Sequence, residues 1–303
     1  MTEAKKPAAP ASKARIFALR TTSTLGLWAL VTCVFVSGNA WAFCGFISLM
    51  AALSLAEFFN MVRKSGSRSF PVLTITTGLL YCVAFTFFHA QGATPPAALD
   101  AGALFVIAGG GFTLLLRHEV SGKDTLHSLA LALLGFIYIP FLFLFTIRII
   151  FIDPAPAAGV MPESGPFLLL WLLAVTKFTD MGAYISGSAI GKHKMIPHIS
   201  PAKTWEGFAG ALIFAQVAAC GLFAIFPRQL APLGAWHHVI ALGFILALLA
   251  VIGDLAESVV KRSLGAKDSG RFLPGIGGAL DLIDSVCFTA PAMYFYLQWI
   301  RGA

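Results

Sequence analysis

Charged residues are scarce in this sequence. Only 12% of its 303 residues are Asp, Glu, Lys or Arg, whereas 58% are hydrophobic. A soluble domain carries about 25% charged residues, so the composition excludes an ordinary water-soluble globular protein. We therefore predict an all-α, polytopic membrane protein.

Paired cysteines are also absent. The five cysteines are scattered through apolar segments and none forms a CxxC pair. Single cysteines in apolar surroundings behave as small buried hydrophobes, which argues against a disulfide framework or a cysteine metal site. The chain likewise has no heptad array, no soluble domain and no convincing internal repeat.

The net charge of +7 is the remaining global feature. In a soluble protein a basic balance would suggest nucleic acid as a partner. In a membrane protein it reflects basic cytoplasmic loops. We therefore expect a lipid bilayer, and no nucleic acid, as the partner. The sequence does not specify an oligomeric state, and a homodimer remains open.

Residues 1–14 are rich in Ala, Pro and Lys, and we predict that they form a disordered cytoplasmic tail. Nine apolar runs of about 20 residues follow, each long enough to cross a bilayer as a helix. They fall at roughly 18–37, 40–62, 69–90, 99–116, 127–147, 166–186, 206–226, 237–260 and 277–300. The first five form an N-terminal transmembrane region, residues 15–165. The last four form a C-terminal region, residues 166–303, which carries the polar clusters described below.

Basic residues set the predicted orientation. With the N-terminus inside, the inside segments hold 17 of the 21 Lys and Arg residues and the outside segments hold three. A miscounted helix would invert every later loop, so this asymmetry favours an inside N-terminus and an outside C-terminus. As an alternative, the basic start and Ala40-Trp41-Ala42 resemble a cleavable signal peptide. Cleavage would leave eight spans with the same inside loops.

The last two predicted spans and the segment between them carry charges that are unusual in a membrane protein. Residues 253–285 read GDLAESVVKRSLGAKDSGRFLPGIGGALDLIDS. A carboxylate at bilayer depth costs at least a few kcal/mol, so such groups face a partner, a metal or a water-filled cavity. Asp254, Ser258 and Lys261 are spaced i, i+4 and i+7, which places them on one face of a helix.

A pair of carboxylates follows on the next predicted helix, where Asp281 and Asp284 are spaced i and i+3. Hard oxygen ligands of this kind suit Mg²⁺. Mg²⁺ beside lysine and arginine is the usual equipment for handling nucleotide phosphates. Four cations lie between the two carboxylate groups: Lys261, Arg262, Lys267 and Arg271.

A second polar cluster ends the sixth predicted span and continues into the next inside loop. Lys177, Asp180 and Tyr184 share one helix face, and the loop carries Ser200 and Lys203. A self-neutralising Lys–Asp pair in the membrane would be one explanation of the first two. The loop, however, faces the same compartment as the first cluster. We therefore predict that the two clusters form one site.

The first five spans hold one notable charge, Glu57, with Asn60 one turn later. Carboxylates near the end of a membrane helix are often solvated or paired. We interpret Glu57 as such a group rather than as a catalytic one.

These motifs resemble those of a known family. The run Ser258-x-x-Lys261-Arg262-x4-Lys267-Asp268, the Leu-Pro-Gly-x-Gly-Gly run and the Asp-x-x-Asp pair look like the signature of phosphatidate cytidylyltransferases, also called CDP-diglyceride synthases. Asp-x-Gly-Ala-Tyr at 180–184 and Ile-Ser-Pro-x-Lys-Thr-Trp-Glu-Gly at 199–207 resemble the family's second conserved block. Together the blocks cover about a third of the chain.

The resemblance implies a nucleotidyltransferase of phospholipid biosynthesis that converts CTP and phosphatidate to CDP-diacylglycerol and pyrophosphate. It implies a multi-pass protein of the inner membrane whose active site faces the cytoplasm, with residues 166–303 as the catalytic region. It implies Mg²⁺, with a second cation possible. The expected metal ligands are Asp254, Asp281 and Asp284. The expected catalytic residues are Asp254, Ser258, Lys261 and Arg262, and the expected substrate-binding residues are Asp180, Ser200, Lys203, Lys267, Gly277 and Gly278.

Two other functions remain open at this point. A CTP-dependent lipid kinase would transfer the γ-phosphoryl group instead, and an ion-coupled transporter would use intramembrane carboxylates as ion sites. The chain also departs from the family at two positions, with Ile276 where His is common and Leu282 where Arg is common. The departures could mark a divergent subgroup, a changed substrate preference or an inactive relative. We expect an active enzyme.

Overall fold

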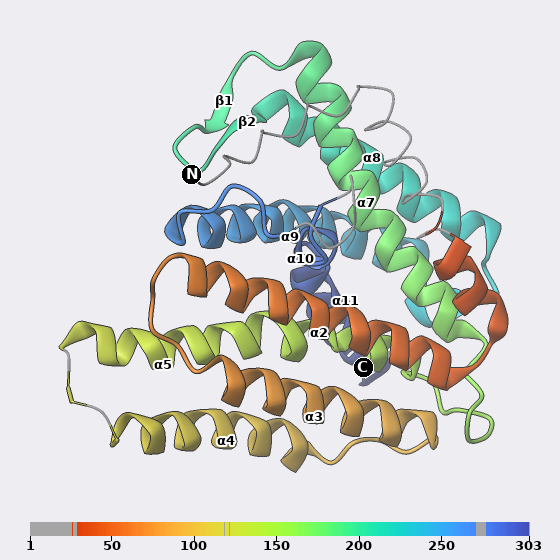
Figure 1. Cartoon of the computed structure of the whole chain (residues 1–303). Coiled ribbons are helices and arrows are strands. Elements are labelled where there is room, and N and C mark those ends of the chain that lie inside the picture. Colours follow the sequence, from red (N-terminus) through yellow and green to blue (C-terminus); the bar gives the residue numbers. More distant parts are fainter. Residues whose placement is uncertain (1–25, 27–28, 118, 121, 271–276, 303) are drawn as a thin grey trace, which may run out of the picture.

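The computed structural model describes residue 26 and residues 29–117, 119–120, 122–270 and 277–302. The described chain is mostly helical (Figure 1). Its α-helices are α2 (Ala40–Lys64), α3 (Pro71–Ala90), α4 (Ala97–Leu115), α5 (Lys123–Phe136), α6 (Phe145–Ile150), α7 (Ser164–Ile190), α8 (Trp205–Ile225), α9 (Trp236–Ser263), α10 (Leu280–Ile283) and α11 (Val286–Gly302). A π-helical turn, η1 (Ile137–Phe141), follows α5, and a 3₁₀ turn, η2 (Ala231–Leu233), precedes α9.

Local signals explain where the long helices begin. The side chain of Asn39 caps α2 by accepting hydrogen bonds from the first backbone amides, at 2.8 Å from Trp41. Pro71 stands at the start of α3, where its missing amide proton costs nothing. Thr204 caps α8 by accepting from the amide of Gly207 at 3.1 Å. These caps define the helix ends that the apolar runs alone leave approximate.

Seven helical segments among the described residues are long and apolar enough to cross a membrane. They are α2, α3, α4, the continuous run Lys123–Ile150 formed by α5, η1 and α6, and then α7, α8 and α9. They agree with seven of the nine predicted spans. The predicted span at 18–37 falls largely outside the described residues, of which 29–37 are helical. The predicted span at 277–300 is divided at residues 284–285 into the short α10 and the 17-residue α11.

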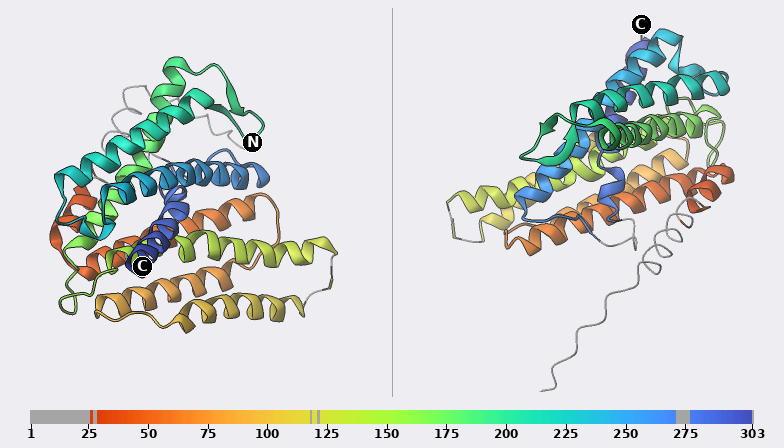
Figure 2. Two further views of the ribbon diagram at one scale, coloured as in Figure 1. Left: turned by 180° about the vertical axis from the view of Figure 1, so that it is seen from behind. Right: turned by 90° about the horizontal axis from the view of Figure 1, so that it is seen from above.

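The helices form two neighbouring groups (Figures 1 and 2). In one, α2, α3, α4 and α5 lie side by side, and in the other α7 packs against both α8 and α9. α11 runs between the groups and contacts α6, α7 and α9. The loops predicted to be inside gather at one end of the bundle, on the left of Figure 1. The end of α9 and the segment between α7 and α8 lie there together.

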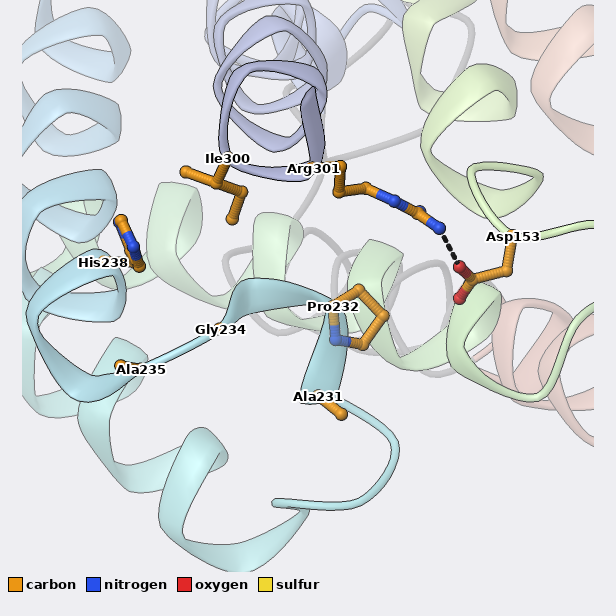
Figure 3. Close-up of a pocket in the computed structure, with 8 residues that line it drawn as sticks. All are labelled: Asp153, Ala231, Pro232, Gly234, Ala235, His238, Ile300 and Arg301. Atoms are coloured by element: carbon orange, nitrogen blue, oxygen red, sulfur yellow. Dashed lines mark hydrogen bonds and ion pairs between the residues drawn. The ribbon is translucent and has the colours of Figure 1, made fainter. Parts of the chain in front are cut away.

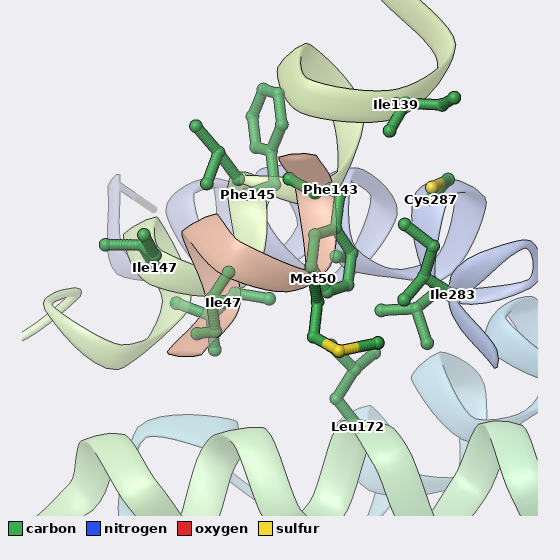
Figure 4. Packing of buried hydrophobic residues seen from close by; sticks show 14 of the residues in the cluster. Ile47, Met50, Ile139, Phe143, Phe145, Ile147, Leu172, Ile283 and Cys287 are labelled. Atoms are coloured by element: carbon green, nitrogen blue, oxygen red, sulfur yellow. The ribbon is translucent and has the colours of Figure 1, made fainter. Parts of the chain in front are cut away.

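A continuous apolar core joins the two groups (Figure 4). Ile47 and Met50 of α2, Ile139 of η1, Leu172 of α7 and Ile283 of α10 are all buried in it. Because α10 carries Asp281 and is anchored in this core, the core fixes the position of the carboxylate-bearing turn relative to both groups.

The predicted inside loop between α7 and α8 contains a small departure from the all-α prediction. Residues Lys194–Ile196 and Ser200–Thr204 form an antiparallel two-stranded hairpin, β1 and β2. Glu206 holds its base by accepting hydrogen bonds from the amide of Lys192 at 3.1 Å and from the ring of His193 at 2.6 Å. The hairpin gives the polar loop a defined shape, and Lys203 of β2 contacts Asp254 of α9.

Candidate active site

The hairpin brings the two polar clusters into direct contact. Lys203 on β2 forms an ion pair with Asp254 on α9, with 2.6 Å between Nζ and Oδ2. Both side chains are half-buried. Residues 180–207 and 254–285, which the sequence predicts to share a site, therefore meet through this ion pair.

The close packing of α7 on α8 sets the position of the hairpin and of Asp180. A Cβ at Gly182 would lie 2.6 Å from the carbonyl oxygen of Gly210, so only glycine allows this approach. Asp180 lies one turn from Lys177, at 3.4 Å between Nζ and Oδ2. This is the predicted i, i+3 pair. Asp180 lies on α7, which packs against both α8 and α9.

The second lysine of the site, Lys261, lies between two carboxylates. Its Nζ is 2.5 Å from Oε2 of Glu257, one turn earlier on α9, and 3.0 Å from Oδ1 of Asp281 on α10. Glu257 is only 2% exposed. A cation shared by two carboxylates offsets the cost of burying them. The contact to Asp281 also holds α10 against α9.

The glycines before α10 allow the side chain of Asp281 to approach the backbone of the residues that precede it. Oδ2 of Asp281 accepts a hydrogen bond from the amide of Gly278 at 2.8 Å. Gly277 has a φ angle of +132°, which favours glycine, and a Cβ there would lie 2.9 Å from the same oxygen. Gly277 and Gly278, predicted to approach substrate phosphate, thus also shape the carboxylate.

Asp284 has different partners from Asp281. It is 4% exposed and accepts from the amide of Ser285 at 2.5 Å. The backbone of α9 lies close to it, since a Cβ at Gly253 would be 3.0 Å from the carbonyl oxygen of Asp284. The two carboxylates of the predicted i, i+3 pair therefore differ in environment, with Asp281 paired to Lys261 and Asp284 buried beside α9.

Four other predicted site residues lie on β2, on α9 or in the loop that follows α9. Ser200 and Ser258 are half-buried, while Arg262 and Lys267 are exposed at the same end of α9. Arg271 and Ile276 lie outside the described residues. Within the described ranges, no group of three or more His, Cys, Asp or Glu side chains is arranged as a ready-made metal site. The metal assignment of Asp254, Asp281 and Asp284 stays a prediction.

Three polar residues of this region were not assigned to the site from the sequence. Glu257 stands beside the predicted helix face and completes the ion pairs of Lys261. Glu57 accepts from the amide of Leu280. Tyr138 lies in the π-helical turn, and its buried hydroxyl finds no hydrogen-bond partner in the part of the chain that the structure describes. A π-helical turn often marks a functional position, and a proline at 140 was its only signal in the sequence.

Two cavities lie outside the ion-paired cluster. A cavity of about 310 Å³ lies at the opposite end of α9, where Arg301 pairs with Asp153 at 2.6 Å beside His238 (Figure 3). His238 and Asp254 are 16 residues apart, about 24 Å along a helix. A second cavity, of about 440 Å³, lies between the end of α2 and the start of α3 and includes Arg63 and Arg68.

The site thus combines lysines held by carboxylates with hard oxygen donors, at one end of a helical membrane bundle. Fixed cations of this kind are groups with which enzymes stabilise negative charge on phosphates. Residues 18–300 match the model of the cytidylyltransferase family. The chain therefore belongs to the cytidylyltransferase family, and it is an enzyme of that family.

Two of the similar proteins are named phosphatidate cytidylyltransferases. The chain is 34% identical to the phosphatidate cytidylyltransferase of Bacillus subtilis over 259 residues, which cover 83% of this chain and 87% of that protein. It is 42% identical to the phosphatidate cytidylyltransferase of Haemophilus influenzae over 136 residues, 45% of this chain and 47% of that protein. It is also 28% identical to the uncharacterized protein YnbB of Escherichia coli over 281 residues, 90% of this chain and 85% of that protein.

Proposed function

We propose that this chain transfers the cytidylyl group of CTP to phosphatidate, giving CDP-diacylglycerol and pyrophosphate. The observation that carries the proposal is the ion pair between Lys203 and Asp254, because it joins both sequence blocks into one cluster of lysines and carboxylates. The names of the relatives from Bacillus subtilis and Haemophilus influenzae support the choice of substrates.

The reaction is a displacement at phosphorus. An oxygen of the phosphatidate phosphate bonds to the α-phosphorus of CTP, and the bond from that phosphorus to the bridging oxygen of pyrophosphate breaks. The nucleophile is already an anion, so the step needs no strong base. The barrier lies in bringing two polyanions together and in the charge that develops on pyrophosphate.

Fixed cations address both parts of that barrier. Lys203 and Lys261 are held in place by carboxylates before any substrate arrives, so they lose little freedom on binding. Arg262 and Lys267 are exposed at the end of α9, where they would bind phosphate oxygens. Ser200 and Ser258 would donate hydrogen bonds, and Asp180 would orient Lys203 through its charge.

The donor chemistry of the cluster fits Mg²⁺. Asp254, Asp281 and Asp284 offer hard carboxylate oxygens, and Oε1 of buried Glu257 has no hydrogen-bond partner within the described residues. We propose that the three aspartates hold Mg²⁺ together with substrate phosphates. When bound, the metal supplies charge neutralisation on the triphosphate.

The same end of the bundle carries the basic loops, so we place it in the cytoplasm of a cell whose inner membrane holds the protein. CTP would then arrive from the aqueous side. Phosphatidate would arrive from the adjoining leaflet.

Labelled CTP tests the proposal. Purified protein is incubated with phosphatidate, Mg²⁺ and CTP labelled at either the α- or the γ-phosphorus. The proposal expects α-label in a CDP-lipid and γ-label in pyrophosphate. Recovery of γ-label in the lipid would instead indicate a lipid kinase, and no chemical change of CTP would contradict an enzymatic role.

A further inference from the structure

Glu57 connects the N-terminal helices to the site. It lies on α2, about two turns before that helix ends, and its Oε2 accepts a hydrogen bond from the backbone amide of Leu280 at 3.0 Å. Leu280 begins α10 and follows the loop that leaves α9, here called the Gly-rich loop (residues 264–279). The contact joins residues that are 223 positions apart.

Both described arms of the Gly-rich loop meet at this carboxylate. A Cβ on Gly270, in the first arm, would overlap Oε1 of Glu57. A Cβ on Gly278, in the second arm, would lie 2.5 Å from Oε2 and 3.0 Å from the amide nitrogen of Gly270. The two arms are therefore adjacent, and the Glu57 side chain occupies the space that side chains at these glycines would need.

Fixing Leu280 also fixes its neighbour, Asp281. Asp281 accepts from Lys261 at 3.0 Å and from the amide of Gly278 at 2.8 Å. A displacement of the loop arms would move the acceptor away from the lysine. In enzymes, a shift of about 1 Å in a positioned group can cost about 100-fold in rate.

We propose that Glu57 is a positioning residue of the active site. Its carboxylate holds the two arms of the Gly-rich loop together from the N-terminal region, and thereby keeps Asp281 against Lys261. The N-terminal helices are then part of the catalytic unit as well as a membrane anchor. This inference rests on the proposed function only for its kinetic readout.

Hydrogen–deuterium exchange of the full-length protein in detergent tests the contact without reference to activity. Glu57→Ala should increase exchange in peptides covering residues 264–270 and 277–285. Glu57→Gln keeps the length and one acceptor oxygen, so it should restore most of the protection. Unchanged exchange in Glu57→Ala would overturn the proposal.

A double-substitution cycle tests the same contact through turnover. Glu57→Ala should lower kcat/KM by about 10- to 100-fold, the range that corresponds to one lost charge-assisted hydrogen bond. Gly270→Ala should also lower it, because the new methyl group displaces the Glu57 side chain. In the Glu57→Ala background, Gly270→Ala should cause little further loss. If the loss of kcat/KM in the double variant equalled the product of the two single losses, the proposal would be contradicted.

Asp100→Asn is the matched control. Asp100 is a half-buried carboxylate of α4 that pairs with Arg148 at 2.6 Å, far from the Gly-rich loop in sequence and outside the site. It should lower thermal stability while leaving loop exchange and kcat/KM unchanged. Equal effects of Asp100→Asn and Glu57→Ala on loop exchange would show a general stability effect and overturn the positioning role.

The outcomes also separate this inference from the proposed function. Increased loop exchange in Glu57→Ala, in a protein that turns over no CTP, would leave the contact standing and remove the proposed reaction. If Glu57→Ala does not fold, hydrogen–deuterium exchange of the Gly-rich loop in Gly270→Ala tests the contact instead, because that substitution displaces the carboxylate without removing it.

Discussion

The two lysines of the site, Lys203 and Lys261, are each held by carboxylates from another element. Lys203 reaches Asp254 at 2.6 Å and Lys261 reaches Asp281 at 3.0 Å. In partly buried pairs, removal of one partner leaves an uncompensated charge. Activity and stability therefore depend on the same few side chains, so each substitution needs a control variant or a separate measurement of stability.

Lys203→Met should lower kcat/KM by about 10- to 100-fold, because a charge-assisted contact to phosphate is lost. Steady-state kinetics with CTP at fixed phosphatidate measures it. Lys194→Met is the control, since Lys194 is exposed on β1 of the same hairpin. Full activity of Lys203→Met would exclude the lysine from phosphate binding.

Leu282→Arg introduces the residue that the family resemblance leads us to expect at this position. Leu282 packs against the apolar core, so an arginine there would place a charge among hydrophobic side chains. We expect a lower midpoint of thermal unfolding in detergent and a KM for CTP within a few-fold of the original. A large gain in CTP affinity with stability intact would show that this chain is a weakened enzyme.

At the scale of elements, the crossing of α9 over the α10–α11 junction positions the carboxylates. A Cβ at Gly253 would lie 2.7 Å from Cα of Ser285 and 3.0 Å from the carbonyl oxygen of Asp284. The hydroxyl of Ser285 donates to the carbonyl of Ala250 at 3.1 Å. This backbone contact brings Asp254 and Asp284 into one cluster.

Gly253→Ala should therefore destabilise the protein by about 1–3 kcal/mol, as overpacking does, and should lower activity through the displaced carboxylates. Thermal unfolding in detergent measures the first effect. Gly221→Ala is the control, because a Cβ there meets nothing within 4 Å and should stabilise α8 by about 0.5–1 kcal/mol. Equal stability of the two variants would refute the tight crossing.

Sequence periodicity and length predicted most elements but not their junctions. The spans from 40 to 263 could be predicted because each is a long apolar run. The division of the last span could not, because it depends on Gly253 of another helix and on the local hydrogen bond between Asp284 and Ser285. The hairpin was likewise hidden, since a three-residue strand such as Lys194–Ile196 carries little periodic signal.

On the scale of the whole molecule, charge asymmetry predicted which loops lie together. The hairpin, the end of α9 and the loop after α2 share one end of the bundle (Figure 1). The side-chain pairs at that end could not be predicted, because residue spacing indicates which side chains share a helix face but not which side chains of other elements they contact. Glu257 and Glu57 became visible as site residues only through contacts to Lys261 and Leu280.

The orientation in the membrane can be tested by labelling. In a variant without native cysteines, a cysteine at Lys194 or Ala266 should react only with reagent on the cytoplasmic side, and one at Ala157 only with reagent outside. The reason is the concentration of basic residues at the hairpin end. Labelling of positions 194 and 266 from opposite sides would contradict a shared site.

The most direct test of the central claim, that this carboxylate–lysine cluster is the active site, is the turnover of Asp281→Asn measured beside Asp124→Asn at equal amounts in the membrane. Asp281 faces Lys261 inside the cluster, whereas Asp124 is exposed in the first turn of α5. The account predicts a loss of about 100-fold or more for Asp281→Asn, as for removal of a group that stabilises developing charge, and near-normal turnover for Asp124→Asn. Near-normal turnover of Asp281→Asn at limiting Mg²⁺ would contradict it.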